Sequence, residues 1–212
     1  MTVTFRNVFK TGVKDRDNFI ARLFGLISEE PIRLWARHST SPYEYVGRPS
    51  LWSRDKGQRF TLDFLLRRRS DGLLFVSEMK CELAYQGYKY LALESCEPIN
   101  RHAKEKAAFR AFLEMAKDPA SYDVTVSVRS RPERVSVSGA ILIWGSITEP
   151  GKQATMSAFG FADVLSVEEA IADLLRETNE PYSAFISQRR QWCDDLFCSL
   201  LDKNAATEKR SP

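Results

Sequence analysis

The stretch of sequence that decides the fold is residues 60–80, which read FTLDFLLRRRSDGLLFVSEMK. Two strand-like runs, 60–67 and 73–80, flank the dipeptide Asp71-Gly72. An Asp-Gly pair between two such runs is a strong local signal for a β-hairpin. We therefore predict an antiparallel pair of strands at the centre of a sheet.

A two-residue turn in this hairpin would set Asp63 opposite Lys80 and Leu65 opposite Glu78. Side chains alternate between the faces of a strand, so Asp63, Glu78 and Lys80 would share one face. The other face is then almost wholly apolar, with Phe60, Leu62, Phe64, Leu66, Leu73, Phe75, Ser77 and Met79. Asp63 and Glu78 become diagonal neighbours, about 7 Å apart or less at Cβ. Two carboxylates at that separation can share one small divalent cation.

Hydrophobic patterning outside the hairpin predicts both helices and strands. Helices are expected over 15–28, 32–37, 84–93, 102–117, 166–177 and 182–201. Strands are expected over 43–46, 122–128, 135–147 and 156–162. Ser166 and Glu169 form a capping box at the start of one of these helices. This order indicates an α/β or α+β fold with a mixed sheet.

Length and composition exclude several classes of protein. A chain of 212 residues, 43% hydrophobic and 28% charged, is one globular domain with additions, and general disorder is excluded. A net charge of +3 is too small for a histone-like DNA binder. Only two histidines are present, and they are far apart with no nearby His or Cys partner, which argues against a zinc site.

The sequence also indicates where in the cell the protein is located. The longest fully apolar stretch is Ala140–Trp144, whereas about 20 residues are needed to span a bilayer. The first ten residues lack the apolar core of a secretory signal, and the four cysteines form no CxxC motif. We therefore expect a cytoplasmic protein with reduced thiols and no membrane partner.

Charge is segregated along the chain behind the small net value. The segment 54–69 carries six basic side chains against two acidic ones, and 163–180 is strongly acidic. A basic surface near the hairpin would attract a phosphate backbone. The candidates are Arg67, Arg68 and Arg69, with Arg129, Arg131 and Arg134 as a second group and Trp52 as a surface aromatic residue. Both arginine groups are equally consistent with solvated strand ends.

An Asp on one strand followed by Glu78-Met79-Lys80 on the next resembles the PD-(D/E)xK nuclease superfamily, with its restriction-endonuclease-like fold. The match covers about residues 15–145, and Leu62 replaces the proline that names the motif. Gln86 and Tyr90 resemble the Q-x-x-x-Y that follows the E-x-K motif in the recombination-exonuclease branch. Members often carry an acidic residue on the first helix, for which Asp15, Asp17, Glu29 and Glu30 remain open.

The resemblance implies a metal-dependent nuclease that hydrolyses phosphodiester bonds in DNA. Asp63, Glu78 and the backbone carbonyl of Met79 would hold Mg²⁺ or Mn²⁺. Lys80 would position the attacking water and offset developing negative charge, and Gln86 would orient Lys80 or a phosphate. Tyr90 and the Arg67–Arg69 run would contact nucleic acid.

Two further readings stay open beside the nuclease. The fold could be kept as a nucleic-acid-binding or protein-interaction module with weak or no catalysis, or it could be an α/β domain without a nucleic-acid role. We expect one nuclease-like domain over residues 1–203, with its core at 15–145 and a C-terminal helical part at 163–203. Residues 204–212 would form a flexible tail, and the amphipathic C-terminal helix could support a homodimer.

Overall fold

The computed structural model describes residues 5–9, 11–80, 91–128 and 131–201. The chain divides into two compact units, Met1–Asp173 and Leu174–Pro212. Among the helices in these described ranges, none is both long enough and apolar enough to cross a bilayer.

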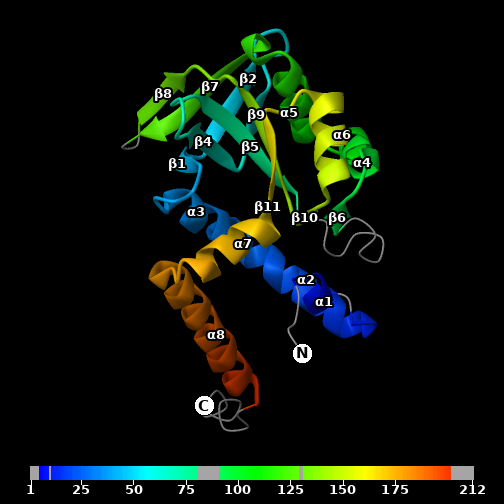
Figure 1. The fold of residues 1–212 in the computed structure, drawn as a ribbon, viewed down its shortest axis with the longest axis vertical. Helices are drawn as coiled ribbons and strands as arrows, with labels where there is room; N and C mark the ends of the chain where they lie inside the picture. Colours follow the sequence, from blue (N-terminus) through cyan, green and yellow to red (C-terminus); the bar gives the residue numbers. More distant parts are fainter. Residues whose placement is uncertain (1–4, 10, 81–90, 129–130, 202–212) are drawn as a thin grey trace, which may run out of the picture. The chain divides into compact units, whose positions relative to one another are not determined.

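The first unit holds a mixed sheet and the helices that flank it (Figure 1). Its helices are α1 (Phe5–Phe9), α2 (Lys14–Ile27), α3 (Glu29–Arg37), α4 (Glu97–Glu105), α5 (Ala107–Lys117), the short η1 (Pro119–Ser121) and α6 (Glu149–Phe159). Helix α7 (Val167–Arg176) crosses the boundary between the units, and α8 (Glu180–Leu201) belongs to the second unit.

The strands within the described residues form three sheets. They are β1 (Tyr43–Gly47), β2 (Pro49–Ser53), β3 (Arg59–Thr61), β4 (Phe64–Arg68), β5 (Leu74–Lys80), β6 (Ala92–Leu93), β7 (Tyr122–Val128), β8 (Arg131–Val135), β9 (Gly139–Trp144), β10 (Ser146–Ile147) and β11 (Asp163–Ser166). The central sheet has the order β1-β4-β5-β9-β11. A second sheet has the order β3-β2-β7-β8, and β10 pairs with β6.

The central sheet is mixed, which confirms the α/β class with a mixed central sheet flanked by helices. Strands β1, β4 and β5 pair antiparallel, whereas β5, β9 and β11 pair parallel. Strand β9, GAILIW, is buried at every position, as parallel strands covered on both faces are. The hydrophobic run of β9 therefore places it inside the sheet.

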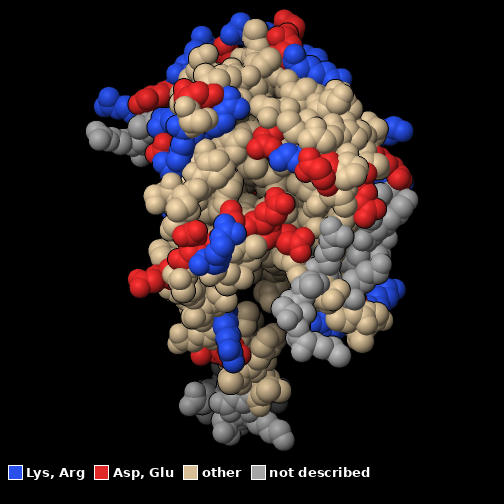
Figure 2. Space-filling model, in the orientation of Figure 1, with Lys and Arg blue, Asp and Glu red and all other residues tan. Residues whose placement is uncertain are grey.

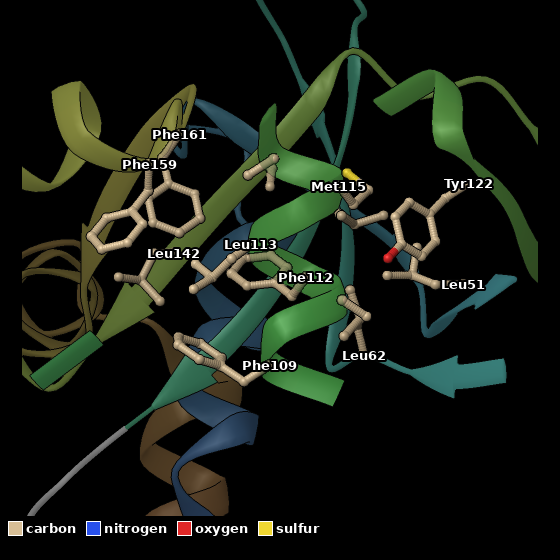
Figure 3. Packing of buried hydrophobic residues seen from close by; sticks show 14 of the residues in the cluster. Leu51, Leu62, Phe109, Phe112, Leu113, Met115, Tyr122, Leu142, Phe159 and Phe161 are labelled. Carbon is tan, nitrogen blue, oxygen red and sulfur yellow. The ribbon is translucent and has the colours of Figure 1, made fainter. Parts of the chain in front are cut away.

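Helix α5 covers one face of the central sheet. Its apolar residues recur at helical spacing, so Phe109, Phe112, Leu113 and Met115 all lie on its buried side. Figure 3 shows these side chains packed among Leu51 and Tyr122 of the second sheet, Leu142 of the central sheet, Leu62 between the two sheets, and Phe159 and Phe161 at the end of α6 and just after it. One hydrophobic core thus joins the two large sheets.

The hairpin forms, but its register differs from the prediction by two residues. Arg67 lies opposite Leu74, and a four-residue loop, 69–72, replaces the two-residue turn. The Arg68 guanidinium binds both carboxylate oxygens of Asp71, and Gly72 takes a left-handed conformation with φ +75°. These local bonds favour the longer loop. A shift of two residues leaves every side chain on its predicted face.

The predicted strand over 60–67 is interrupted. Leu62 and Asp63 separate β3, which belongs to the second sheet, from β4, which belongs to the central sheet. The chain therefore crosses from one sheet to the other at Asp63. Leu65 and Val76, which share a face with Asp63 and Glu78, are fully buried in the hydrophobic core.

Other elements also differ from the sequence prediction. The expected edge strand over 156–162 lies largely in α6, where Thr148 accepts a hydrogen bond from the Gly151 N–H and Gly160 ends the helix at φ +75°. These capping signals outweigh a short apolar run. The expected helix over 102–117 is two helices, and the backbone at Lys106 is extended with no local sequence feature to account for it.

The remaining differences concern strands. The expected strand over 135–147 is divided among the end of β8, then β9 and β10. Arg131 and Arg134, the described residues of the second arginine group, lie in β8. Of the helix expected over 84–93, residues 84–90 lie outside the described residues, and Ala92 and Leu93 form β6.

Candidate active site

Asp63 lies between β3 and β4, so its neighbours follow from extending the strand pairing of both large sheets. The Leu62 N–H donates to the Pro49 carbonyl at 3.0 Å, which extends the β2–β3 ladder beyond its last pair and sets Arg48 opposite Asp63. The β4–β5 register, extended by one residue, sets Asp63 opposite Glu78. Asp63 therefore faces an arginine from one sheet and a carboxyl group from the other.

The backbone of β5 holds Asp63 in place. The Met79 N–H donates to Asp63 Oδ2 at 2.9 Å. Because Asp63 sits directly across from Glu78 instead of diagonally, the two carboxyl groups are closer neighbours than the sequence register implied. The hydrogen bond from Met79 fixes the Asp63 side chain at the edge of β5.

Glu78 is buried and only half satisfied. Its residue surface is 7% exposed, and Lys80 Nζ donates to Glu78 Oε1 at 2.5 Å. Glu78 Oε2 is buried and accepts no hydrogen bond from the described residues. Lys80 Nζ also lies 5.8 Å from the centre of the Phe109 ring on α5. The lysine is therefore positioned by a carboxylate and an aromatic face.

Burial raises the pKa of Glu78 to about 7. The nearby Lys80 ammonium opposes this rise in pKa, while the negative charge of Asp63 adds to it. Desolvation penalises the ionised form of a carboxyl group, and a like charge beside it does the same. Near neutral pH, Glu78 is therefore close to the point at which it gains or loses its proton.

Arg48 links the site to the first helices. Its guanidinium Nη2 lies 3.3 Å from Asp63 Oδ1 and 3.9 Å from Glu29 Oε1, and its Nε donates to the Leu62 carbonyl at 3.3 Å. Among the four acidic residues that the sequence left open, Glu29 at the start of α3 is the one joined to Asp63 through this shared arginine. It also accepts a hydrogen bond from Arg33.

The other helical acidic residues have different surroundings. Asp17 accepts hydrogen bonds from the Thr11 N–H, the Thr11 hydroxyl and the Gly12 N–H, so it closes the turn before α2. Glu30 pairs with Arg33 at 3.1 Å. Asp15 is exposed in the first turn of α2.

The predicted nucleic-acid-binding arginines lie at the other end of β4. Arg67 is four residues from Asp63, about 13 Å along a strand. Arg67 pairs with Glu44 at 3.0 Å, Arg68 pairs with Asp71, and Arg69 donates to the Ala36 and His38 carbonyls. The structure therefore gives each arginine a partner within the protein.

Gln86 and Tyr90 lie outside the described residues, so their predicted roles stay predictions. The sequence reasoning missed Arg48 and Phe109 as neighbours of the site. Arg48 comes two residues before Ser50, so its side chain points to the same side as that of Ser50. This position indicates a contact with Asp63 only once the pairing of β2 with β3 is known.

The donor set fits magnesium better than zinc. Within the described ranges no group of three His, Cys, Asp or Glu side chains lies close enough to hold a metal ion. Mg²⁺ is commonly bound by one or two carboxylates, with water and substrate phosphate completing its shell. The Asp63–Glu78 pair, with one buried carboxyl oxygen lacking a donor, meets that lesser requirement.

Comparisons with known proteins add no relative. Neither a scan against protein-family models nor searches of curated proteins and of solved structures returned a match for this chain. The case for a function therefore rests on the residues of this site.

Proposed function

We propose that this protein is a metal-dependent nuclease that hydrolyses phosphodiester bonds in DNA and uses the restriction-endonuclease-like fold. The observation that carries the proposal is the pairing of Asp63 with Glu78 across neighbouring strands, with Lys80 bonded to Glu78. The order of the central sheet supports it, since an antiparallel hairpin bears the acidic residues and a parallel strand, β9, follows beside β5.

Each side chain has a defined task in this proposal. Asp63 and Glu78 would hold Mg²⁺ or Mn²⁺, which when bound polarises a phosphoryl oxygen and lowers the pKa of its water. Lys80 supplies a fixed positive charge for the negative charge that develops on the phosphate. Arg48 forms an ion pair with Asp63, and its half-exposed guanidinium can also contact a substrate phosphate.

The test is hydrolysis of single-stranded and duplex DNA in Mg²⁺ or Mn²⁺. We expect Asp63→Asn and Lys80→Met to lose about 100-fold or more in rate, in the range for loss of a charged catalytic group. Asp71→Asn, in the loop of the same hairpin, is the matched control and should keep its rate. Full activity in the Asp63 and Lys80 variants would refute the proposal.

One observation favours a second function, a nucleic-acid-binding module without catalysis. Both carboxyl groups already contact cations of the protein, Arg48 for Asp63 and Lys80 for Glu78. Such pairs can replace a metal ion as counter-charges. Calorimetric titration separates the two functions, because absence of Mg²⁺ and Mn²⁺ binding at millimolar concentration, with DNA binding intact, would support the module.

A further inference from the structure

The second sheet turns a polar and basic face away from the core. Residues directly opposite in antiparallel strands point to the same side. Leu51, Phe60, Val124 and Val135 form one row across the sheet and pack in or against the hydrophobic core. The rows on either side of it therefore point outward.

Two outward-facing rows contain the polar, charged and aromatic side chains of this face. One row is Ser50, Thr61, Thr125 and Arg134, and the next is Trp52, Arg59 and Asp123. We call these residues, together with Arg54 at the end of β2, the outer face. Lys and Arg side chains lie over the β7–β8 end of this sheet, with acidic side chains among them (Figure 2).

Trp52 is an exposed platform on the outer face. Its surface is 41% exposed, and the Arg59 guanidinium lies 5.6 Å from the centre of its ring. Arg59 is held in turn by Ser50, whose hydroxyl accepts from Nη2 at 3.0 Å. A large aromatic ring fixed on one side and open to solvent is suited to stack with a flat ligand group.

Asp123 orients two further arginines beside this platform. Arg54 donates to Asp123 Oδ1 at 2.9 and 3.1 Å, and Arg134 donates to Oδ2 at 3.1 Å. Each guanidinium has five N–H donors, so most stay available to a ligand. With Arg59 included, the outer face carries three arginines and one aspartate, so its net charge is positive.

Surface depressions follow these residues. A cavity of about 410 Å³ is lined by Trp52, Ser53, Arg54, Asp123, Thr125 and Arg134. A second cavity, of about 640 Å³, shares Arg54, Asp123 and Arg134 with the first. Arg54 and Arg134 thus line both cavities.

The outer face also leads to the candidate active site. In the β2–β3 register, the row after Ser50 and Thr61 on the same side is Arg48 and Asp63. Four residues separate Arg59 from Asp63, which is about 13 Å along a strand. A ligand lying over Trp52 can therefore extend across this sheet to the carboxylates.

We propose that the outer face binds single-stranded nucleic acid, with a base stacked on Trp52 and phosphates held by Arg54, Arg59 and Arg134. This inference rests on the proposed function, because it names the form of substrate that the Asp63 site receives. An unpaired base presents its flat face to an aromatic ring, whereas a duplex hides its base faces inside the stack. The positive charge suits phosphates and is independent of sequence.

The test measures binding of a fluorescein-labelled dT15 strand, and of a duplex of equal length, by anisotropy in EDTA. Metal-dependent hydrolysis cannot occur under these conditions. We expect Trp52→Ala to weaken binding of the single strand by about 5- to 100-fold, and Trp52→Phe to keep most of the affinity. Arg134→Ala should lower the slope of affinity against salt concentration by about one.

Matched controls lie on α8, where Trp192 is 52% exposed and Arg190 is exposed. Trp192→Ala and Arg190→Ala should bind dT15 as the unaltered protein does. Unchanged affinity in Trp52→Ala, equal loss in Trp192→Ala, or equal affinity for the duplex would each overturn the inference.

Different results would refute the nuclease proposal and the proposal that the outer face binds single strands. Asp63-dependent hydrolysis with full dT15 affinity in Trp52→Ala would leave the nuclease standing and refute the outer face as its binding site. Trp52-dependent binding without hydrolysis in any metal would refute the nuclease and keep the binding surface.

Discussion

Replacing Glu78 by Gln should make the protein more stable at alkaline pH. Burial holds the pKa of Glu78 at about 7 against an ordinary value of 4.5. Each pKa unit corresponds to 1.36 kcal/mol. Ionising Glu78 therefore costs about 3 kcal/mol more in the folded protein than in the unfolded chain. The Gln amide keeps the shape, removes the charge and can donate to Asp63.

The sign follows from proton binding. Between pH 4.5 and about 7 the folded protein keeps the Glu78 proton while the unfolded chain has lost it. Stability therefore falls as pH rises through this window and levels off above the folded pKa. The contribution of Glu78 is complete below pH 4.5 and absent at pH 8.5.

The assay is urea unfolding of both proteins at pH 5 and pH 8.5 in EDTA. Subtracting the stability of the unaltered protein from that of the variant cancels the other titrating groups, and we expect this difference to change by about 2.5 kcal/mol between the two pH values. Glu44→Gln, an exposed carboxylate paired with Arg67, is the matched control and should change by less than about 0.5 kcal/mol. An equal pH dependence in Glu78→Gln and the unaltered protein would refute the burial argument.

Three further predictions concern packing and metal binding. A Cβ at Gly151 would lie 2.0 Å from the Leu93 carbonyl oxygen, so Gly151→Ala should cost about 3 kcal/mol in urea unfolding, and a loss under about 0.5 kcal/mol would contradict this close approach. Phe112 is fully buried beneath the sheet, so Phe112→Ala should cost about 3–5 kcal/mol, and a smaller loss would mean that the cavity collapses. Arg48→Ala removes a cation that competes with a metal ion for Asp63, so the affinity for Mg²⁺ measured by calorimetry should rise by about 3-fold or more. A lower affinity for Mg²⁺ would show instead that Arg48 supports the site.

Part of the site could be predicted from the sequence because strand alternation is a local property. Asp63, Glu78 and Lys80 stay on one face under either register, since the observed shift is two residues. The register itself depended on bonds between Arg68 and Asp71 in the loop, which the Asp-Gly pair alone does not specify. The resemblance that named these residues concerns local motifs, and Gln86 and Tyr90 remain predictions.

What the sequence by itself determined was the hairpin, the apolar helices and the grouping of two carboxyl groups with a lysine. Only the tertiary structure decided that the chain changes sheets at Asp63, that Arg48 and Glu29 meet there, and that Phe109 of α5 lies beside Lys80. The outer face also depends on tertiary structure, because β7 pairs with β2, which lies about 70 residues earlier in the chain, and β8 pairs with β7. Periodicity specifies which way a side chain points on its own strand. Burial and pairing between distant segments specify what it meets, and through desolvation they set its charge.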